Sequence, residues 1–304
     1  MKIVYAGSPQ YAVKPLEALI NSGKEVVAVI TQPDKPVGRK RVLTPTPVKQ
    51  FALNAGIPVI DCERLKEHTD EIEALGADLM ITCAYGQILT EKILNIFPMG
   101  VYNLHASLLP KFRGASPIQS AILAGEEFTG VTVMKTERTL DSGAILLVKR
   151  IKIDGDTYGE LSEKLSSLSA LAAIEAVTLL EVGEPQLLLQ DEAAATFCKK
   201  ISKDMAKVDF ANDCKTVASF INAYSPSPAA YAILNGNNVN LLKATPCQES
   251  GEAGTVLKAD KTGIVVACGE GAVKILSLQF AGGKILTAAD AVNGRKINKG
   301  DKFD

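Results

Sequence analysis

Strand-like and helical patterns alternate through the first half of the chain, and this alternation limits the fold more than any other feature. Runs of mostly apolar residues occur at 2–6, 25–31, 57–60, 77–84 and 101–106, and helical patterns follow the first two of them. Strands that alternate with helices are joined by crossover connections and form a mostly parallel, twisted sheet. Ligands of such sheets collect at the carboxyl ends of the strands. The sequence therefore predicts a Rossmann-like α/β domain with its chemistry at one edge of the sheet.

The pattern changes after Gly183. Residues 184–207 combine a proline, mixed charge and little periodicity, which is typical of a linker between domains. Short strand-like runs then follow a helical stretch and are separated by turn sequences; they lie at 229–234, 237–244, 254–260, 263–269 and 272–279. Short strands at this spacing predict a small barrel or sandwich. We expect a first domain over residues 1–188, a linker over 189–207 and a smaller second domain over 208–304.

The overall charge limits the partners of the chain. It carries 33 Lys and Arg residues against 34 Asp and Glu residues, so the net charge is −1. Any RNA would therefore have to be held by a local basic patch rather than by the whole surface. The N-terminus lacks the pattern of a signal peptide, and charges interrupt the apolar stretches before the ~20 residues of a membrane span. We expect a cytoplasmic protein that does not enter a membrane.

Neither a metal site nor a dinucleotide site is favoured. The six cysteines are scattered without a C-x-x-C spacing, which favours free thiols over zinc ligands or disulfides. After the first strand only Gly7 is present, where a dinucleotide fingerprint needs several glycines. His68, one of the two histidines, lies in a charged helical pattern and is expected to be solvated.

The second histidine has chemically useful neighbours. Asn103 and His105 stand two positions apart near the end of an expected strand, so their side chains share one face. Pro110 ends the strand soon afterwards, because it cannot donate a ladder hydrogen bond. Asp141, in an Asp-Ser-Gly turn, is the best candidate for a third member. Taken alone, a histidine at a strand end is more often structural, and Asp141 is as easily an Asx-turn residue.

An amide, an imidazole and a carboxylate suggest acyl transfer in which the attacking nucleophile belongs to a substrate. The chain has no G-x-S-x-G elbow that would supply a nucleophile of its own. Asn103 and a protonated His105 would stabilise the oxyanion of a tetrahedral intermediate. Asp141 would keep the imidazolium charged and carry protons.

The residues NLHASLLPKFRGASPIQSAI (103–122) and LDSGAIL (140–146) resemble the folate-dependent formyltransferase family, and the resemblance runs almost end to end. The resemblance implies transfer of a formyl group from 10-formyltetrahydrofolate to an amine, without a metal. It gives catalytic roles to Asn103, His105 and Asp141. It also implies folate contacts from the SLLP turn and from the AYG sequence, namely Ser107, Leu108, Leu109, Pro110, Tyr85 and Gly86.

A basic loop at residues 31–49 points to the acceptor amine. This segment is rich in Gly and Pro, and Asp34 is its one acidic residue. Its basic residues are Lys35, Arg39, Lys40, Arg41 and Lys49. The loop resembles the one that family members acting on initiator methionyl-tRNA insert after the second strand, and phosphates attract such cations. Residues 277–296 are similar to the end of those members, whose second domain is an OB-like barrel that binds tRNA. The resemblance implies formation of N-formylmethionyl-tRNA for translation initiation, and we expect a monomer.

The sequence departs from this pattern in two places, and three alternatives stay open. Phe112 stands where these members usually have Trp, and residues 221–231 lack a Trp-Pro-Gly sequence. An enzyme that formylates an amino sugar nucleotide would share the SLLP turn and the three polar residues, but would have less reason for the basic loop. A glycinamide ribonucleotide formyltransferase would be a single domain with a glycine loop near its start. A catalytically dead RNA-binding protein would keep the loop and the barrel without needing the three polar residues.

Overall fold

The computed structural model describes residues 1–38 and 40–304, and its contacts divide the chain into two compact units. The first unit contains Met1–Pro117, Thr129–Ile151 and Ser162–Cys198, and the second contains Ile118–Phe128, Lys152–Leu161 and Lys199–Asp304. A mostly parallel sheet dominates the first unit and an antiparallel sheet dominates the second. The predicted fold class is therefore confirmed, while the proposed domain limits stay a prediction.

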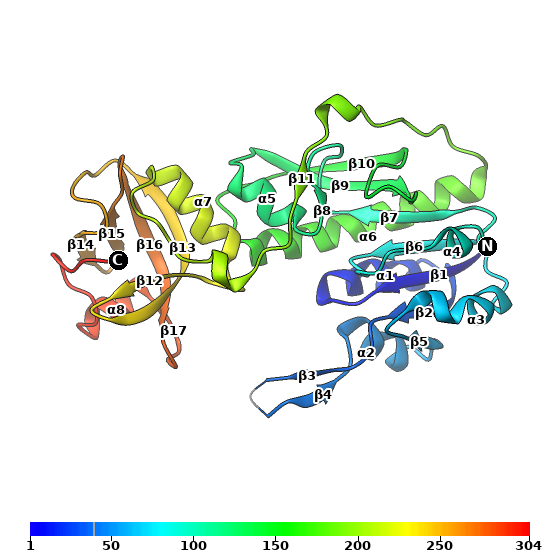
Figure 1. Cartoon of the computed structure of the whole chain (residues 1–304), viewed down its shortest axis with the longest axis horizontal. Coiled ribbons are helices and arrows are strands. Elements are labelled where there is room, and N and C mark those ends of the chain that lie inside the picture. The colour runs from blue at the N-terminus through cyan, green and yellow to red at the C-terminus, as the bar shows by residue number, and fades with distance from the viewer. Residues whose placement is uncertain (39) are drawn as a thin grey trace. The chain divides into compact units, whose positions relative to one another are not determined.

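The first unit is built on a seven-stranded sheet of order β10-β9-β7-β6-β1-β2-β5 (Figure 1). The strands are β1 (Lys2–Gly7), β2 (Glu25–Thr31), β5 (Val59–Asp61), β6 (Leu79–Cys83), β7 (Val101–His105), β9 (Phe128–Lys135) and β10 (Ile145–Lys152). The five strands from β7 to β5 pair in parallel, and β7 pairs antiparallel with β9. The carboxyl ends of β1, β6 and β7 therefore meet at one edge, beside the start of β9.

Helices cover both faces of this sheet because its central strands are buried on both sides. One face packs against α3 (Thr69–Ala74) and α4 (Glu91–Leu94) through an apolar cluster that includes Ile72, Met80 and Ile93. Helix α6 (Tyr158–Val182) runs along the other face near α1 (Val13–Asn21), where Lys14 Nζ donates to Ser167 Oγ at 3.0 Å (Figure 1). Helix α2 (Pro47–Asn54) follows β2 and a hairpin.

Helix α6 begins as the sequence predicts. The Thr157 backbone N–H donates to the Glu160 carboxylate at 2.8 Å, and the Glu160 N–H donates back to Thr157 Oγ1 at 3.3 Å. This reciprocal pair satisfies amides that the first turn cannot pair within the helix. Among the described helices, α6 alone is long and apolar enough to cross a membrane by length and composition.

The second unit contains an antiparallel sheet of order β12-β13-β16-β15-β14, with β17 paired to β16. The strands are β12 (Ala230–Leu234), β13 (Asn237–Cys247), β14 (Val256–Asp260), β15 (Gly263–Ala267), β16 (Ala272–Phe280) and β17 (Ile285–Thr287). Residues 300–304 close this sheet, because the Asp304 N–H donates to the Ile233 carbonyl and the Phe303 N–H donates to the Gly254 carbonyl, both at 2.9 Å. The two outer strands are thus joined through one segment, as a barrel requires.

Three helices belong mainly to the second unit: α5 (Pro117–Leu123), α7 (Cys214–Tyr224) and α8 (Ala288–Asn293). Helix α7 packs on β13, where the buried Asn222 amide donates to the Ala244 carbonyl and accepts from the Ala244 N–H, both at 3.0 Å. The Phe220 and Tyr224 rings stack at 4.4 Å between centroids. These contacts pack the segment that lacks Trp-Pro-Gly against the sheet.

Two short strand pairs complete the fold of the first unit. Strands β3 (Lys35–Val37) and β4 (Val42–Thr44) form an antiparallel hairpin that projects from the sheet (Figure 1). Strand β8 (Arg113–Gly114) pairs in parallel with β11 (Phe197–Cys198). Through this second pair, part of the expected linker lies beside the loop that follows β7.

Candidate active site

Asn103 and His105 lie at the carboxyl end of β7, as the sequence predicts. Asn103 pairs with Thr82 in register, and Thr82 Oγ1 donates to the Asn103 side-chain oxygen at 2.9 Å. This bond orients the amide, because it assigns the oxygen to Thr82 and leaves the NH₂ group on the other side. Within the described residues that NH₂ group is a donor available to a ligand.

His105 is buried, with 5% of its side chain exposed. Its Nε2 lies 3.0 Å from the Phe112 carbonyl oxygen, and its Nδ1 lies 3.7 Å from Asp141 Oδ2. Burial lowers the pKa of the imidazole below its ordinary value, although the Asp141 carboxylate and the Phe112 carbonyl act in the opposite direction. At neutral pH the imidazole is therefore mainly neutral. The role that the sequence analysis gives to a protonated His105, which is to stabilise the tetrahedral intermediate, stays a prediction.

Asp141 reaches this site from the turn after β9. Its Oδ2 accepts a hydrogen bond from the Gly114 N–H at 2.8 Å, and its φ of 50° is unusual for a residue other than glycine. Gly143 makes the turn possible, because a Cβ there would lie 1.7 Å from the Lys135 carbonyl oxygen. The structure thus brings Asp141 to His105 across a separation in sequence that no spacing rule covers.

The SLLP turn is held rigidly against β9. Thr132 Oγ1 donates to the Ser107 carbonyl at 2.7 Å and accepts from the Leu109 N–H at 3.2 Å. Ser107 and Leu109 are buried, whereas Leu108 and Pro110 are half-buried. The turn therefore offers a ligand its backbone and the side chains of Leu108 and Pro110.

The AYG sequence forms a tight loop after β6. Ala84 and Gly86 have φ values of 47° and 83°. The Tyr85 ring is buried with its hydroxyl 4.0 Å from Cys62 Sγ, and burial raises the pKa of this phenol. Tyr85 thus points into the core, and its contribution to a ligand site would come from its backbone. Gln87, which the sequence analysis did not single out, anchors the loop by donating to the Cys62 carbonyl at 2.9 Å.

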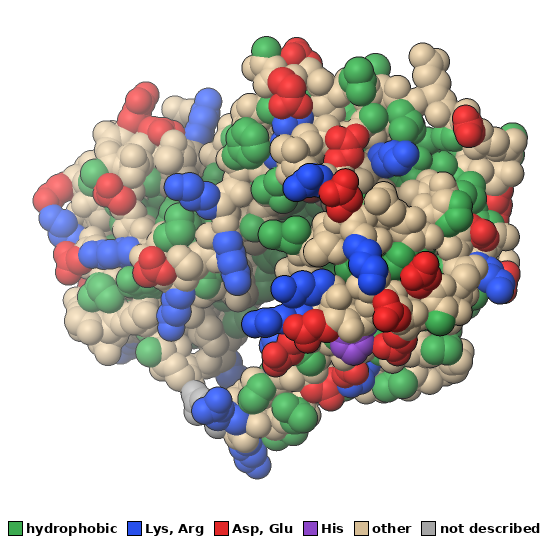
Figure 2. All heavy atoms as spheres, turned by 45° about the vertical axis from the view of Figure 1, so that its right-hand side comes forward, with side chains coloured by type: hydrophobic (Ala, Val, Ile, Leu, Met, Phe, Trp, Pro, Cys, Tyr) green, Lys and Arg blue, Asp and Glu red, His purple; other side chains and the backbone are tan. Residues whose placement is uncertain are grey.

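The basic residues of the hairpin differ in their surroundings. Lys35, Lys40 and Arg41 are exposed, and Figure 2 shows Lys and Arg side chains gathered at this arm; Arg39 lies outside the described residues. Lys49 is instead bonded to Asp34 at 2.7 Å and to Asp61 at 2.6 Å, and these two carboxylates raise the pKa of its ammonium.

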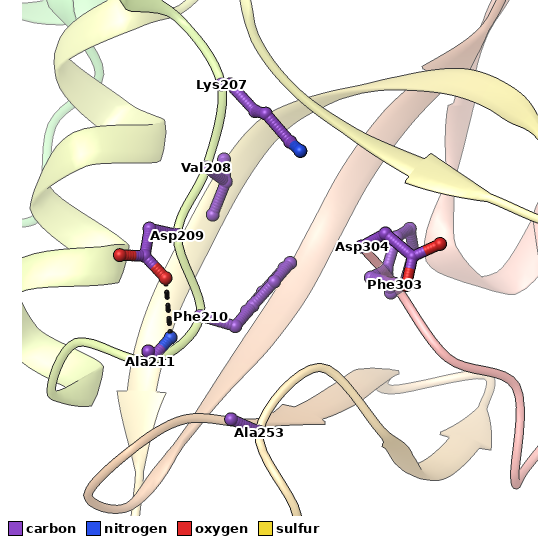
Figure 3. Close-up of a pocket in the computed structure, with 8 residues that line it drawn as sticks. All are labelled: Lys207, Val208, Asp209, Phe210, Ala211, Ala253, Phe303 and Asp304. Carbon is purple, nitrogen blue, oxygen red and sulfur yellow. Dashed lines mark hydrogen bonds between the residues drawn. The ribbon is translucent and has the colours of Figure 1, made fainter.

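Two cavities lie outside the β7 site. One, of about 480 Å³, adjoins the base of the hairpin and contains no charged side chain; its lining is Gln10, Val13, Thr44, Pro45, Pro47, Gln50, Phe51 and Asn54. The other, of about 450 Å³, lies in the second unit beside the closing segment of the barrel (Figure 3). Its lining is Lys207, Val208, Asp209, Phe210, Ala211, Ala253, Phe303 and Asp304.

The described residues contain no group of three or more His, Cys, Asp or Glu side chains placed to hold a metal ion. The cysteines are free; Cys62, Cys83 and Cys268 are buried, and the other three are half-buried. His68 is partly exposed and lies 2.8 Å from the Glu71 carboxylate. Sequence reasoning missed Gln190, which bonds to the Asp141 turn, and its partner Arg113, because no periodic pattern marks the segment from 189 to 198 that connects them.

The arrangement at β7 suits transfer of an acyl group. It combines an oriented amide donor, a buried neutral imidazole and a carboxylate beside it, next to a rigid turn with an accessible backbone. An amide donor stabilises an oxyanion, and a neutral imidazole accepts a proton.

Comparison with known proteins agrees with this chemistry. Residues 1–177 match the family described as formyl transferase, and residues 200–296 match the formyl transferase C-terminal domain. A methionyl-tRNA formyltransferase of Stutzerimonas stutzeri (strain A1501) is 43% identical over 97% of this chain and 95% of that protein. One of Thermotoga sp. (strain RQ2) is 42% identical over 100% of this chain and 98% of that protein.

A solved structure shares the fold. The N-formyltransferase from Helicobacter canadensis, in complex with folinic acid and dTDP-3-aminofucose, has a TM-score of 0.70 at 20% identity and covers 90% of this chain and 98% of its own. The family expected from the NLHASLLP and LDSG sequences is confirmed by the match over both units. The chain therefore belongs to the formyl transferase family of enzymes, which take their formyl group from a folate-derived donor.

Proposed function

We propose that this enzyme transfers a formyl group from 10-formyltetrahydrofolate to the α-amino group of initiator methionyl-tRNA. The observation that carries the proposal is the His105–Asp141 pair beside Asn103, in the same unit as an exposed basic hairpin. The relatives that are 42% and 43% identical over nearly the whole chain are methionyl-tRNA formyltransferases, which supports the same acceptor. The product is N-formylmethionyl-tRNA, which serves translation initiation in the cytoplasm.

Transfer makes a bond from the amine nitrogen to the formyl carbon, breaks the bond from that carbon to the folate nitrogen, and moves one proton from the amine to the leaving nitrogen. The Asn103 NH₂ group donates to the formyl oxygen as it becomes negative; loss of one such donor costs about 2.7–4 kcal/mol of transition-state stabilisation. His105, neutral before the reaction, accepts the proton. Asp141 stabilises the resulting imidazolium, which then gives the proton to the leaving folate nitrogen and becomes neutral again.

The folate donor would be held by the SLLP turn and the loop at Gly86. The backbone from Ser107 to Pro110 is fixed by Thr132, and Leu108 and Pro110 add apolar surface for a ring. Gly86 leaves open space beside its Cα, so a planar ligand can approach the backbone there.

The tRNA would be held by the hairpin and the barrel. Lys35, Arg39, Lys40 and Arg41 provide phosphate contacts, while Lys49 fastens the base of the hairpin through Asp34 and Asp61. The uncharged cavity at that base is lined by the Phe51 ring and by the side-chain amides of Gln10, Gln50 and Asn54. An aromatic ring for stacking and amides for hydrogen bonds suit an unpaired nucleobase. The domain over residues 208–304 acts as an OB-like tRNA-binding module on a monomeric enzyme.

Incubation with labelled 10-formyltetrahydrofolate and charged initiator tRNA tests the proposal, with a UDP-amino sugar as the competing acceptor. We expect label on the aminoacyl group. Label on the sugar alone would assign the enzyme to the amino sugar branch of the family. Binding of tRNA with no label on either acceptor would favour an RNA-binding protein without activity.

A further inference from the structure

Residues 189–198, here called the return segment, cross back to the loops that carry the catalytic groups. Strand β11 of this segment pairs with β8, and the Arg113 N–H donates to the Thr196 carbonyl at 2.8 Å. The Phe112 N–H donates to Thr196 Oγ1 at 2.8 Å, and the Cys198 thiol lies 3.4 Å from the Phe112 carbonyl. The Phe112 carbonyl, which contacts His105, is therefore held in place by the return segment: Cys198 contacts the carbonyl itself, and Thr196 bonds to the N–H groups of Phe112 and Arg113.

Gln190 joins this segment to the turn of Asp141. Its Nε2 donates to the Asp141 carbonyl at 2.9 Å and to the Gly143 carbonyl at 2.7 Å. Its Oε1 accepts from Arg113 Nε at 3.1 Å and from Arg113 Nη2 at 2.8 Å. One amide group thus uses two donor and two acceptor positions to connect the loop after β7 with the turn after β9.

Arg113 is the buried partner of this amide. Its side chain is 1% exposed and also bonds to both carboxylate oxygens of Glu192, at 2.7 and 2.9 Å. Glu192 raises the pKa of the guanidinium, and the Asp141 carboxylate acts in the same direction. The next residue, Gly114, donates its N–H to Asp141 Oδ2, so the loop that Arg113 anchors also holds the reactive carboxylate.

We propose that Gln190 is a positioning residue of this enzyme: it bridges Arg113 and the Asp141 turn and so sets the Asp141 carboxylate against His105. The proposal rests on the catalytic roles given above to Asp141 and His105. Chemistry makes the residue hard to replace, because only a side-chain amide donates two hydrogen bonds and accepts two at once. A shorter Asn would not span the same gap, and Glu or Met would leave two backbone carbonyls without their donor.

The two histidines of the chain allow a direct test by NMR, because each gives one titrating ring signal and His68 serves as an internal control. Asp141 is the charged group beside His105; Arg113 with its partner Glu192 acts on Asp141, and the Cys198 thiol lies on the Phe112 carbonyl that His105 contacts. In the full-length protein we expect Asp141→Asn to lower the pKa of His105. Gln190→Met should shift it in the same direction by a smaller amount, because the carboxylate moves away. The signal of His68 should not change.

A double-mutant cycle gives the second readout. Gln190→Met should reduce kcat about 10- to 100-fold, since a displacement of ~1 Å of a catalytic group has effects of that size, with both KM values within about threefold. The double variant Gln190→Met/Asp141→Asn should be no slower than Asp141→Asn alone, because residues that act as a unit are not additive. Thr178→Val is the control: it removes an exposed hydroxyl that donates to the Ile174 carbonyl at 2.8 Å on α6, and kcat should be unchanged.

The outcomes separate this proposal from the proposed function. An unshifted His105 signal in Gln190→Met, or losses that multiply in the double variant, would overturn the positioning role while leaving the catalytic site in place. An unshifted signal in Asp141→Asn would overturn it as well, since Gln190 would have no group to act through. If Gln190→Met does not fold, Gln190→Glu is measured instead; it keeps the bonds from Arg113 and loses both donations. If the enzyme formylates another acceptor, the proposed function is wrong, but the His105 titration still tests the positioning role of Gln190.

Discussion

The end of β7 and the β3/β4 hairpin belong to the same unit and are built in opposite ways. At β7, Asn103, His105 and Asp141 each have a partner within hydrogen-bonding or ion-pairing distance. Asp141 and Phe112, whose carbonyl contacts His105, have φ values of 50° and 60°, so the turns that position these groups are tight. At the hairpin, Lys35, Lys40 and Arg41 are exposed and make no ion pair within residues 1–38 and 40–304. Transfer of a formyl group needs fixed atoms, whereas contact with phosphates needs cations that can reach. Substitutions in the two regions should therefore affect different kinetic constants.

The largest effect should come from His105→Ala. We expect turnover to fall about 10²- to 10⁴-fold, the range of a general acid–base group, while the affinity for charged tRNA stays within a few-fold of wild type. Formylation kinetics and a tRNA binding assay on the same preparation test this. His68→Ala, which replaces the other histidine, should leave both quantities unchanged. Wild-type rates in His105→Ala would rule out the proposed role.

Asp141→Asn should reduce turnover more than stability and should also alter the pH profile. The carboxylate raises the pKa of His105 against the larger effect of burial, so its loss lowers that pKa further. Activity that needs a neutral imidazole is lost as pH falls through this pKa, and the acid limb of the kcat/KM profile should therefore move to lower pH. Asp70→Asn, which removes an exposed carboxylate on α3, is the control. An unchanged profile and rate would make Asp141 an ordinary turn residue.

The hairpin should control binding rather than chemistry. Changing Arg39, Lys40 and Arg41 together to Ala should raise the KM for charged tRNA, with little effect on folate. The slope of log affinity against log salt should decrease by about 2 to 3, since each lost phosphate contact removes ~0.7–0.9. Steady-state kinetics at several salt concentrations measure this, with Lys66→Ala/Lys92→Ala as the control for exposed cations elsewhere. Indistinguishable curves would make the hairpin solvated surface and favour the amino sugar acceptor.

Lys49→Met should have the smallest effect and would refine the comparison, because Lys49 belongs to the hairpin region but is held in place. Loss of its bonds to Asp34 and Asp61 should loosen the base of the hairpin. Ion pairs near a surface contribute about 1 kcal/mol or less each, and the loss of these two acts mainly on the stability of the hairpin, so the KM for tRNA should rise only a few-fold. The salt slope should stay nearly unchanged, because no phosphate contact is lost. A slope change as large as that of one Arg would instead make Lys49 a direct tRNA contact.

The sequence predicted those features that depend on local pattern. Period-two alternation placed Asn103 and His105 on one face of β7, and the Thr157–Glu160 spacing predicted the start of α6. Features that depend on distant partners could not be predicted in this way. The lowered pKa of His105 follows from burial by several elements, and the pairing of Lys49 with Asp61 depends on β5 reaching α2. The return segment shows no periodicity because the partners of its polar groups lie in two distant loops: Gln190 bonds to the Asp141 turn, and Thr196 bonds to the loop after β7.

Residues 300–304 also bear on the solubility of the protein. They pair with Ile233 beside one outer strand of the barrel and with Gly254 and Val256 beside the other. A chain shortened after residue 299 would leave β12 and β14 with unpaired backbone groups at both edges of the sheet. Open edges of this kind act as templates for pairing with other chains. The five residues thus protect the second unit from self-association, and a truncated protein should aggregate under conditions in which the full chain stays in solution.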